Sequence, residues 1–266
     1  MGQLNHNQKD NFDNLPLLKA TEASVEVAKY WQALFATGDD VLTTSSIEVR
    51  SNTKLEAEER FMLLGTVTGP DKAIMLPEIA AQLPCLNRTQ SVNLSQLRSE
   101  LAKAGLILHS ADYIFYFSAT QKLTLTPDVA VRQLNQDDAA DFSEFQRQCS
   151  ESELDNASVE LDDWMVYGLF NDGRLVCIAS AYHGENDKMA DIGVITLPTE
   201  RGKSYATRVV RAISHDICAQ NFEPQYRCQQ DNEASISVAK SVGLALYCTW
   251  EPLSPNSDTD DFIVSH

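Results

Sequence analysis

The residues of this sequence best suited to chemistry lie in the stretch TLPTERGKSYATRVVRAISH, positions 196 to 215. Arg201, Gly202, Lys203 and Ser204 form a turn between an apolar segment and a predicted helix. The first N–H groups of a helix have no partner within the helix, and the helix dipole places positive charge at that end. A basic, glycine-containing turn at this position is therefore typical of an anion-binding site.

The turn also reads G-K-S, as does the end of the phosphate loop of nucleoside-triphosphate-binding proteins. That motif requires a glycine five residues before Gly202, where this sequence has Leu197. The pattern therefore argues against such a loop. A surface helix whose basic side chains are simply solvated stays open as the alternative to an anion site.

The elements around the turn must hold it in place. An apolar segment at 189–198 predicts a strand, and residues 204–220 predict a helix with one buried face. The apolar residues of that face recur every three or four positions: Ala206, Val209, Val210, Ile213 and Ile217. A helix anchored in this way keeps its N-terminus pointing in a fixed direction.

The surrounding part of the chain, residues 126–266, has a regular pattern. An Asn171-Asp172-Gly173 turn between two apolar runs predicts a hairpin. The predicted strands are 129–134, 164–170, 174–183, 189–198, 224–229, 244–250 and 261–265, and the predicted helices are 137–149, 204–220 and 232–242. Antiparallel strands followed by strand–helix units indicate a mixed sheet of the α/β (α+β) class.

Residues 1–20 are polar and predict a flexible tail. Residues 21–125 predict an N-terminal α/β domain, which carries no chemical motif. Its elements are a helix at 23–35, strands at 40–50, 60–69 and 112–120, and a helix that starts after Asn93 and ends before Gly105. A Thr-rich, Pro-containing connector places the domain boundary near residue 125.

Charge divides unevenly between the two parts. The net charge is −17, and residues 127–266 hold 24 acidic and 10 basic side chains, against 14 and 11 in residues 1–126. Such an acidic chain lacks the positive surface that nucleic-acid binding needs. Even so, four of those ten basic residues cluster at the turn and its helix: Arg201, Lys203, Arg208 and Arg211.

Neither a membrane nor a metal is expected as a partner. No apolar run approaches the roughly 18 to 20 residues that cross a bilayer. The six cysteines and five histidines are scattered, without the spacing of zinc ligands. These features predict a cytoplasmic protein, and they give no indication of its oligomeric state.

The turn and the segments on either side of it resemble the GNAT superfamily of acyl-CoA-dependent N-acyltransferases. That family's pyrophosphate loop follows R/Q-x-x-G-x-G/A, and residues 201–206 read Arg-Gly-Lys-Ser-Tyr-Ala. The strand ADIGVITLP before it, the helix start DNEAS at 231–235 and the closing VGLALY occur in the family's order. The resemblance covers about residues 127–266, and Ser204 departs from the family's usual glycine.

The resemblance implies acetyl-CoA (coenzyme A) as co-substrate and assigns residues to it. The backbone of Val194, Ile195 and Thr196 would pair with the pantetheine arm, and Asn232 and Ser235 would lie near its far side. The residues that would hold the diphosphate are Arg201, Gly202, Lys203, Ser204, Tyr205 and Ala206. Ordinary strand, turn and helix-cap roles are the alternative for all of them.

Acyl transfer to an amine needs a base, because only about one lysine-like amine in two thousand is neutral at pH 7. Asp191 aligns with the position at which several family members carry a glutamate base, with His183, Glu185 and Asp187 as rivals. The family's usual acid, a tyrosine seven residues after Asn232, is replaced by Ala239. Tyr247 is the predicted substitute.

Two functions are consistent with these residues. The first is an N-acetyltransferase that acts on a small-molecule or protein amine. The second, motivated by Ser204 and Ala239, is a module that binds coenzyme A without catalysis. A further hypothesis treats residues 21–125 as a degenerate copy of the same fold that shapes the acceptor site.

Overall fold

The computed structural model describes residues 12, 14–56, 59–87, 92–184 and 188–254. Its helices are α1 (Val25–Ala36), α2 (Pro77–Ala81), α3 (Leu94–Lys103), α4 (Ala119–Lys122), α5 (Ala139–Gln146), α6 (Glu151–Ala157), α7 (Tyr205–Ala219) and α8 (Glu233–Val242). Its strands are β1 (Asp39–Thr43), β2 (Ile47–Ser51), β3 (Phe61–Thr66), β4 (Asp71–Met75), β5 (Asp112–Tyr116), β6 (Val131–Gln133), β7 (Met165–Asn171), β8 (Arg174–His183), β9 (Met189–Thr196), β10 (Glu223–Gln229) and β11 (Ala245–Pro252).

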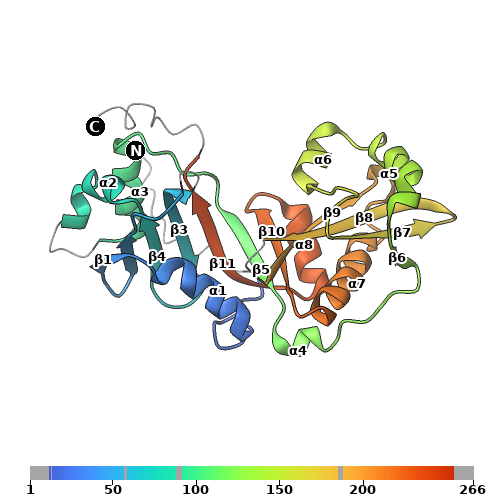
Figure 1. Ribbon diagram of the computed structural model, residues 1–266, viewed down its shortest axis with the longest axis horizontal. Helices are drawn as coiled ribbons and strands as arrows, with labels where there is room; N and C mark the ends of the chain where they lie inside the picture. Colours follow the sequence, from blue (N-terminus) through green and yellow to red (C-terminus); the bar gives the residue numbers. More distant parts are fainter. Residues whose placement is uncertain (1–11, 13, 57–58, 88–91, 185–187, 255–266) are drawn as a thin grey trace.

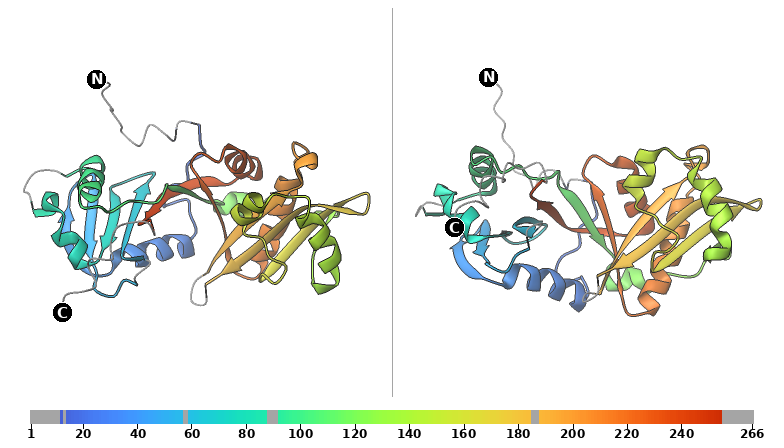
Figure 2. Two further views of the ribbon diagram at one scale, coloured as in Figure 1. Left: turned by 90° about the horizontal axis from the view of Figure 1, so that it is seen from above. Right: turned by 45° about the horizontal axis from the view of Figure 1, so that its top comes forward.

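Within the described residues, the strands form one 11-stranded sheet in the order β1-β2-β4-β3-β11-β5-β10-β9-β8-β7-β6. Two neighbouring pairs, β2 with β4 and β9 with β10, are parallel, and the others are antiparallel. The mixed α/β sheet predicted from the sequence is therefore confirmed. The sheet runs the length of an elongated molecule, with helices gathered around each end (Figures 1 and 2).

The middle of the sheet interleaves strands from both ends of the chain. β5 lies between β10 and β11, and β11, the last strand of the described residues, lies between β5 and β3 (Figure 1). A strand from the first half of the sequence thus completes the sheet of the second half. The last strand in turn completes the sheet of the first half.

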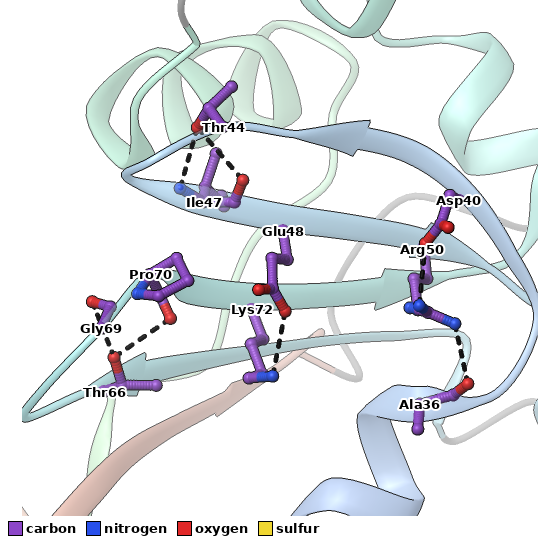
Figure 3. A network of polar contacts seen from close by, with 10 residues as sticks. All are labelled: Ala36, Asp40, Thr44, Ile47, Glu48, Arg50, Thr66, Gly69, Pro70 and Lys72. Carbon is purple, nitrogen blue, oxygen red and sulfur yellow. Dashed lines mark hydrogen bonds and ion pairs between the residues drawn. The ribbon is translucent and has the colours of Figure 1, made fainter.

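The N-terminal end of the sheet replaces the single irregular strand predicted at 40–50 with the hairpin β1–β2. Thr44 and Ser46 form its turn, where the Thr44 hydroxyl accepts from the Ile47 N–H at 3.0 Å. Polar side chains then tie neighbouring strands together, including the ion pair of Lys72 with Glu48 at 3.0 Å (Figure 3). These side chains stabilise this end of the sheet.

Three groups of buried apolar side chains hold the helices on the sheet. The largest group packs α5, α7 and α8 against the strands of the C-terminal part and β5. The second fills the N-terminal end of the sheet around α2 and α3. The third packs α1 against β3, β4 and β5. In the first group, Val209, Val210, Ile213 and Ile217 of α7 are all fully buried, as the apolar spacing predicts. α7 therefore has a fixed position under the strands.

Local predictions have mixed outcomes. The Asn171-Asp172-Gly173 turn is confirmed, because Asp172 and Gly173 have φ of 50° and 77°, as a two-residue hairpin of this type requires. The helix predicted at 137–149 is shorter, since residues 136–138 form a 3-10 turn and α5 ends at Gln146. The strand predicted at 261–265 lies outside the described residues.

The predicted tail, residues 1–20, lies mostly outside the described part of the chain. Its last residues bind along β11: Leu18 N–H donates to the Leu246 carbonyl at 2.8 Å, and Leu246 N–H donates to the Pro16 carbonyl at 2.7 Å. Leu18 is buried beneath α1. Across the described residues, no helix has the length and apolar character that a bilayer crossing demands.

Candidate active site

The candidate site lies where two parallel strands part. β9 and β10 pair over only three residues each, and the last pair is Asp191 with Gln225. Beyond it, the described residues of β9 continue in register with β8, and those of β10 with β5. The edges of β9 and β10 that face each other past Asp191 thus diverge around a gap in the sheet.

Side chains line this gap as a cleft with a cavity of about 100 Å³. Asp191 lies at its vertex. The lining residues are Asn156, Ala157, Ser158, Tyr182, Asp191, Ile192, Gly193, Val194, Tyr226, Arg227 and Ser235. They come from α6, β8, β9, β10 and α8.

The two faces differ in chemistry. Because side chains alternate along a strand, Asp191 and position 193 face the same side of the sheet. Gln225, the ladder partner of Asp191, faces that side too, together with Arg227 two residues further along β10. α6 covers this face, since a Cβ on Gly193 would lie 2.1 Å from the Ala157 carbonyl oxygen. α7 lies on the opposite side of the strands from α6 (Figure 1).

Asp191 is surrounded by donors. The Tyr182 hydroxyl donates to its Oδ2 at 3.2 Å, Arg227 Nη2 lies 3.2 Å from the same oxygen, and Gln225 is its partner across the β9–β10 ladder. The carboxylate side chain is only 14% exposed. Burial raises the pKa of Asp191 above its usual value, and Arg227, Tyr182 and Gln225 oppose that rise. A carboxylate with a raised pKa in a cleft is well suited to accept a proton.

Arg227 links Asp191 to a second carboxylate. Its Nε lies 3.9 Å from Oδ2 of Asp112 on β5, and its guanidinium carbon lies 5.5 Å from the centre of the Trp250 ring. Burial raises the pKa of Asp112 as well. Two carboxylates thus share one guanidinium, which leaves a net negative charge on this face of the cleft when both are ionised.

The predicted anion-binding turn has an open backbone. Gly202 and Ser204 have φ of 78° and 60°, and Ser204 begins α7 without a side-chain hydrogen bond to the helix. No described atom lies within 4 Å of the position that a Cβ on Gly202 would occupy. Backbone N–H groups at the start of α7 therefore lie beside an open turn, as anion binding requires.

The basic side chains of the turn have partners within the chain. Arg201 pairs with Glu153 of α6, Lys203 with Glu200 at 2.8 Å and Arg208 with Asp128 at 2.7 Å. Hydrogen bonds from the Ser150 N–H and from Arg201 lower the pKa of Glu153 to about 2. An anion bound at the turn would therefore compete with Glu153 for the guanidinium of Arg201.

Arg211 lies one turn further along the helix and serves a structural purpose. Its Nη1 donates to the Val242 carbonyl at 2.7 Å and its Nη2 to the Thr124 carbonyl at 2.5 Å. These bonds tie α7 to the end of α8 and to the connector after α4. Of the four clustered basic residues, Arg211 thus has a structural role.

The residues expected along the pantetheine arm are divided between the cleft and its wall. Val194 and Ser235 line the cleft. Ile195 is buried in the core, and the Thr196 carbonyl accepts from Arg201 Nε at 3.3 Å. Asn232 caps α8, with its side-chain oxygen accepting from the Ser235 N–H at 3.0 Å.

Tyr205 and Ala206 open α7 and are partly buried against the main core. Neither is among the residues that line the cleft. Their backbone N–H groups belong to the first turn of α7.

Tyr247 does not reach the cleft. It lies on β11 at the point where the register with β5 shifts, and its ring packs edge-on against Tyr116 at 5.7 Å. Burial raises the pKa of Tyr247 to about 12. Among the rival bases, His183 packs against Trp164 and Phe222, whereas Glu185 and Asp187 lie outside the described residues.

A second cavity adjoins the first on the Asp191 face. It measures about 510 Å³ and shares Ser158 and Tyr182 with the cleft. Its lining includes Asp155, Glu160 and Asp163 and no basic residue. Over the described ranges, none of these three carboxylates forms an ion pair.

Several residues of this site were missed from the sequence. Gln225 and Arg227 alternate within the apolar strand PQYRCQ, and polar residues at every second position of a buried strand were an available signal. α6 was also missed, although Ser150 and Glu153 have the spacing of a capping box, which the structure contains. Tyr182, Asp112 and Tyr116 gave no local signal, because only the strand order brings them near Asp191.

Residues 163–252, about a third of the chain, match the family model described as GNAT acetyltransferase. The resemblance seen in the turn and its flanking segments is therefore confirmed for this part of the chain. None of the curated proteins matches the sequence.

Solved structures of similar shape include an acetyltransferase of the GNAT family from Novosphingobium aromaticivorans, with 19% identity, 56% of this chain and 65% of that chain covered, and a TM-score of 0.44. The match thus spans less than two thirds of that protein. A GNAT-family acetyltransferase from Colwellia psychrerythraea has 11% identity, 68% and 76% coverage, and a TM-score of 0.46. An aminoglycoside N-acetyltransferase solved with CoA has 19% identity, 42% and 89% coverage, and a TM-score of 0.33.

Proposed function

We propose that this protein is an N-acetyltransferase that transfers an acetyl group from acetyl-CoA to a primary amine by direct attack. The observation that carries the proposal is the parting of β9 and β10 at Asp191, together with the open turn at the start of α7. The family match of residues 163–252 supports the same reaction. We assign the acyltransferase domain to residues 126–266, with β5 of the N-terminal region completing its sheet.

Coenzyme A would bind with its diphosphate at the turn of residues 201–206 and its pantetheine arm in the cleft. The diphosphate would accept from the first N–H groups of α7 and from Lys203, with Arg201 released from Glu153. The unpaired edge of β9 near Val194 would take the arm, and Ser235 would face it from α8. The bound thioester supplies an activated acetyl carbonyl.

The acceptor amine would reach that carbonyl from the α6 face. The second cavity, with Asp155, Glu160 and Asp163, suits a cationic acceptor, small molecule or protein, and its shared wall with the cleft leads to Asp191. Asp191 removes a proton from the ammonium, directly or through water. The neutral nitrogen then attacks the carbonyl carbon and the carbon–sulfur bond breaks. The nitrogen loses its second proton as the amide forms, and the thiolate gains one, so that the products are the amide and the free thiol.

The thiolate needs a proton donor of its own. Tyr247 is separated from the cleft, and Ala239 occupies the family's usual acid position. Tyr182, which lines the cleft beside Asp191, replaces Tyr247 as our candidate for this acid. Replacement of Tyr182 by Phe would then slow thiol release, whereas replacement of Tyr247 by Phe would leave it unchanged.

The compartment is also part of the proposal. All six cysteines are free thiols, and four of them are buried. Unpaired cysteines are usual in a reducing environment, which supports the cytoplasm.

Calorimetry with acetyl-CoA tests the binding half of the proposal. Exchanging Arg201 and Lys203 for Glu should weaken binding by at least about tenfold, since each charge-assisted bond contributes about 1.5 to 3 kcal/mol. Glu153→Gln is the matched control and should strengthen binding, because it removes the competitor for Arg201. Unchanged affinity in both variants would move the diphosphate away from this turn.

Thiol release with a panel of amines tests the catalytic half. Release that depends on the amine and is lost in Asp191→Asn supports the enzyme. Tight binding of acetyl-CoA without amine-dependent release would instead support the second function, a binding module, which the absence of a tyrosine at Ala239 favours.

A further inference from the structure

A chain of buried polar side chains connects the N-terminal helix α1 to Asp191. Trp31 of α1, Tyr116 of β5 and Gln225 of β10 are 6%, 0% and 9% exposed. Trp31 Nε1 donates to the Tyr116 hydroxyl oxygen at 3.0 Å, and the Tyr116 hydroxyl donates to Gln225 Oε1. Gln225 is in turn the partner of Asp191 across the β9–β10 ladder, and hydrogen bonding by its side chain lowers the pKa of that carboxylate.

The chain has one direction because it begins at a group that can only donate. An indole N–H has no acceptor role, so the Tyr116 oxygen must accept from it. The buried Tyr116 hydroxyl then needs an acceptor of its own, and Gln225 Oε1 is in place. With its oxygen held in this way, the Gln225 amide presents its nitrogen to Asp191.

The opposite orientation of the amide would be costly. If Gln225 turned its oxygen toward Asp191, two acceptors would face each other and the Tyr116 hydroxyl would lose its acceptor in a dry environment. Trp31 and Tyr116 therefore exclude an arrangement that would repel the ionised form of Asp191.

We infer that Trp31, Tyr116 and Gln225 are positioning residues, which hold a hydrogen-bond donor against Asp191 and keep its carboxylate in place for proton removal. The inference rests on the proposed function of Asp191 as base. It gives the N-terminal region a role in the reaction, because α1 and β5 supply two of the three residues.

The charged groups around Asp191 set the sign of the expected effect. Arg227 of β10 and Tyr182 of β8 contact it directly, and Asp112 of β5 lies on the far side of Arg227. None of these is changed when Tyr116 or Gln225 is replaced. Loss of the Gln225 donor removes a contact that favours the carboxylate, so the pKa of Asp191 should rise further.

The test follows Asp191 itself. Protein labelled with ¹³C at the aspartate carboxyl carbons is titrated by NMR, with the Asp191 signal assigned from Asp191→Asn. Gln225→Met and Tyr116→Phe should move the Asp191 titration to higher pH, and Trp31→Phe should move it less in the same direction. The same variants should shift the acidic limb of the pH profile of kcat/KM to higher pH, with about a tenfold loss below that limb.

Val27→Ala is the matched control, because Val27 is 1% exposed on the same helix and makes no polar contact with the chain of donors. It should lower Tm and leave both the Asp191 titration and the pH profile unchanged. An unmoved Asp191 signal in folded Gln225→Met and Tyr116→Phe, or an equal shift in Val27→Ala, would overturn the inference. The NMR titration needs no acceptor, so absence of acetylation would count against the proposed function alone.

Discussion

The two junctions on either side of β10 behave differently. Toward β9, the ladder spans three residue pairs and then opens into the cleft, whereas toward β5 it runs through four pairs to the end of the strand. β5 is also paired with β11 on its other side. A strand that is hydrogen-bonded along one edge can leave part of its other edge unpaired. The β10–β5 ladder therefore keeps β10 in the sheet where β10 parts from β9.

Removal of β5 should have the largest effect on the two junctions of β10. A fragment of residues 126–266 would expose the edges of both β10 and β11, and fully buried Phe115 would leave a hole between them. We expect this fragment to aggregate or to lose cooperative unfolding, as measured by circular dichroism and gel filtration. Addition of a fragment of residues 14–125 should restore folded protein, and an independently folded monomeric fragment 126–266 would contradict the expectation.

Replacement of Asp191 by Asn separates the chemistry of the open junction from its stability. Activity should fall by at least about a hundredfold, because general-base catalysis is lost. The stability of the folded protein, in contrast, should increase at neutral pH. Since burial raises the folded-state pKa of Asp191 above the unfolded value, ionisation of this group costs stability as pH rises through the folded-state pKa.

The variant should therefore have a higher Tm than the original protein at pH 7, and the gain should vanish below the unfolded pKa near 4. Thermal melts at a series of pH values measure this. A gain that is independent of pH would mean that the charge of Asp191 is not its source.

Much of the C-terminal part of the fold could be predicted from the sequence, but the strand pairing that joins the two parts could not. α7, its buried face and the Asn171-Asp172-Gly173 turn follow from local spacing and turn chemistry. Nothing local indicates that β5 pairs with β10, because strand order depends on which edges are left open after the whole chain has folded. Asp191 was found by resemblance, whereas its neighbours Tyr182, Gln225 and Arg227 required the register of three strands.

Gly193 sharpens the comparison at the wall of the cleft. Gly193→Ala would place a Cβ 2.1 Å from the Ala157 carbonyl oxygen and must push the end of α6 away from β9. We expect a loss of about 1 to 3 kcal/mol of stability in urea unfolding and weaker binding of acetyl-CoA. Gly168→Ala is the control, since its Cβ would meet the ends of Leu175 and Leu134, which can move. Equal effects of the two substitutions on acetyl-CoA binding would show that the contact between Gly193 and α6 has no special role in binding.

Ser204 gives the smallest expected effect. Its φ of 60° lies in the left-handed region, where a Cβ costs about 1 kcal/mol. Ser204→Gly should therefore stabilise the protein by about 1 kcal/mol and leave acetyl-CoA binding the same or tighter. Ser158→Gly, with φ of 47° at the end of α6, should give a similar gain. A loss of binding in Ser204→Gly alone would show that the Ser204 hydroxyl contacts the ligand.

The position of β11 also bears on how the protein is made. On the ribosome, β3 leaves the exit tunnel long before β11, the strand that must lie beside it, because the two are far apart in the sequence. Until then the nascent chain carries the uncovered edge of β3, where chaperones or aggregation partners can attach. The yield of native protein should therefore depend on how well the edge of β3 is protected until β11 has emerged.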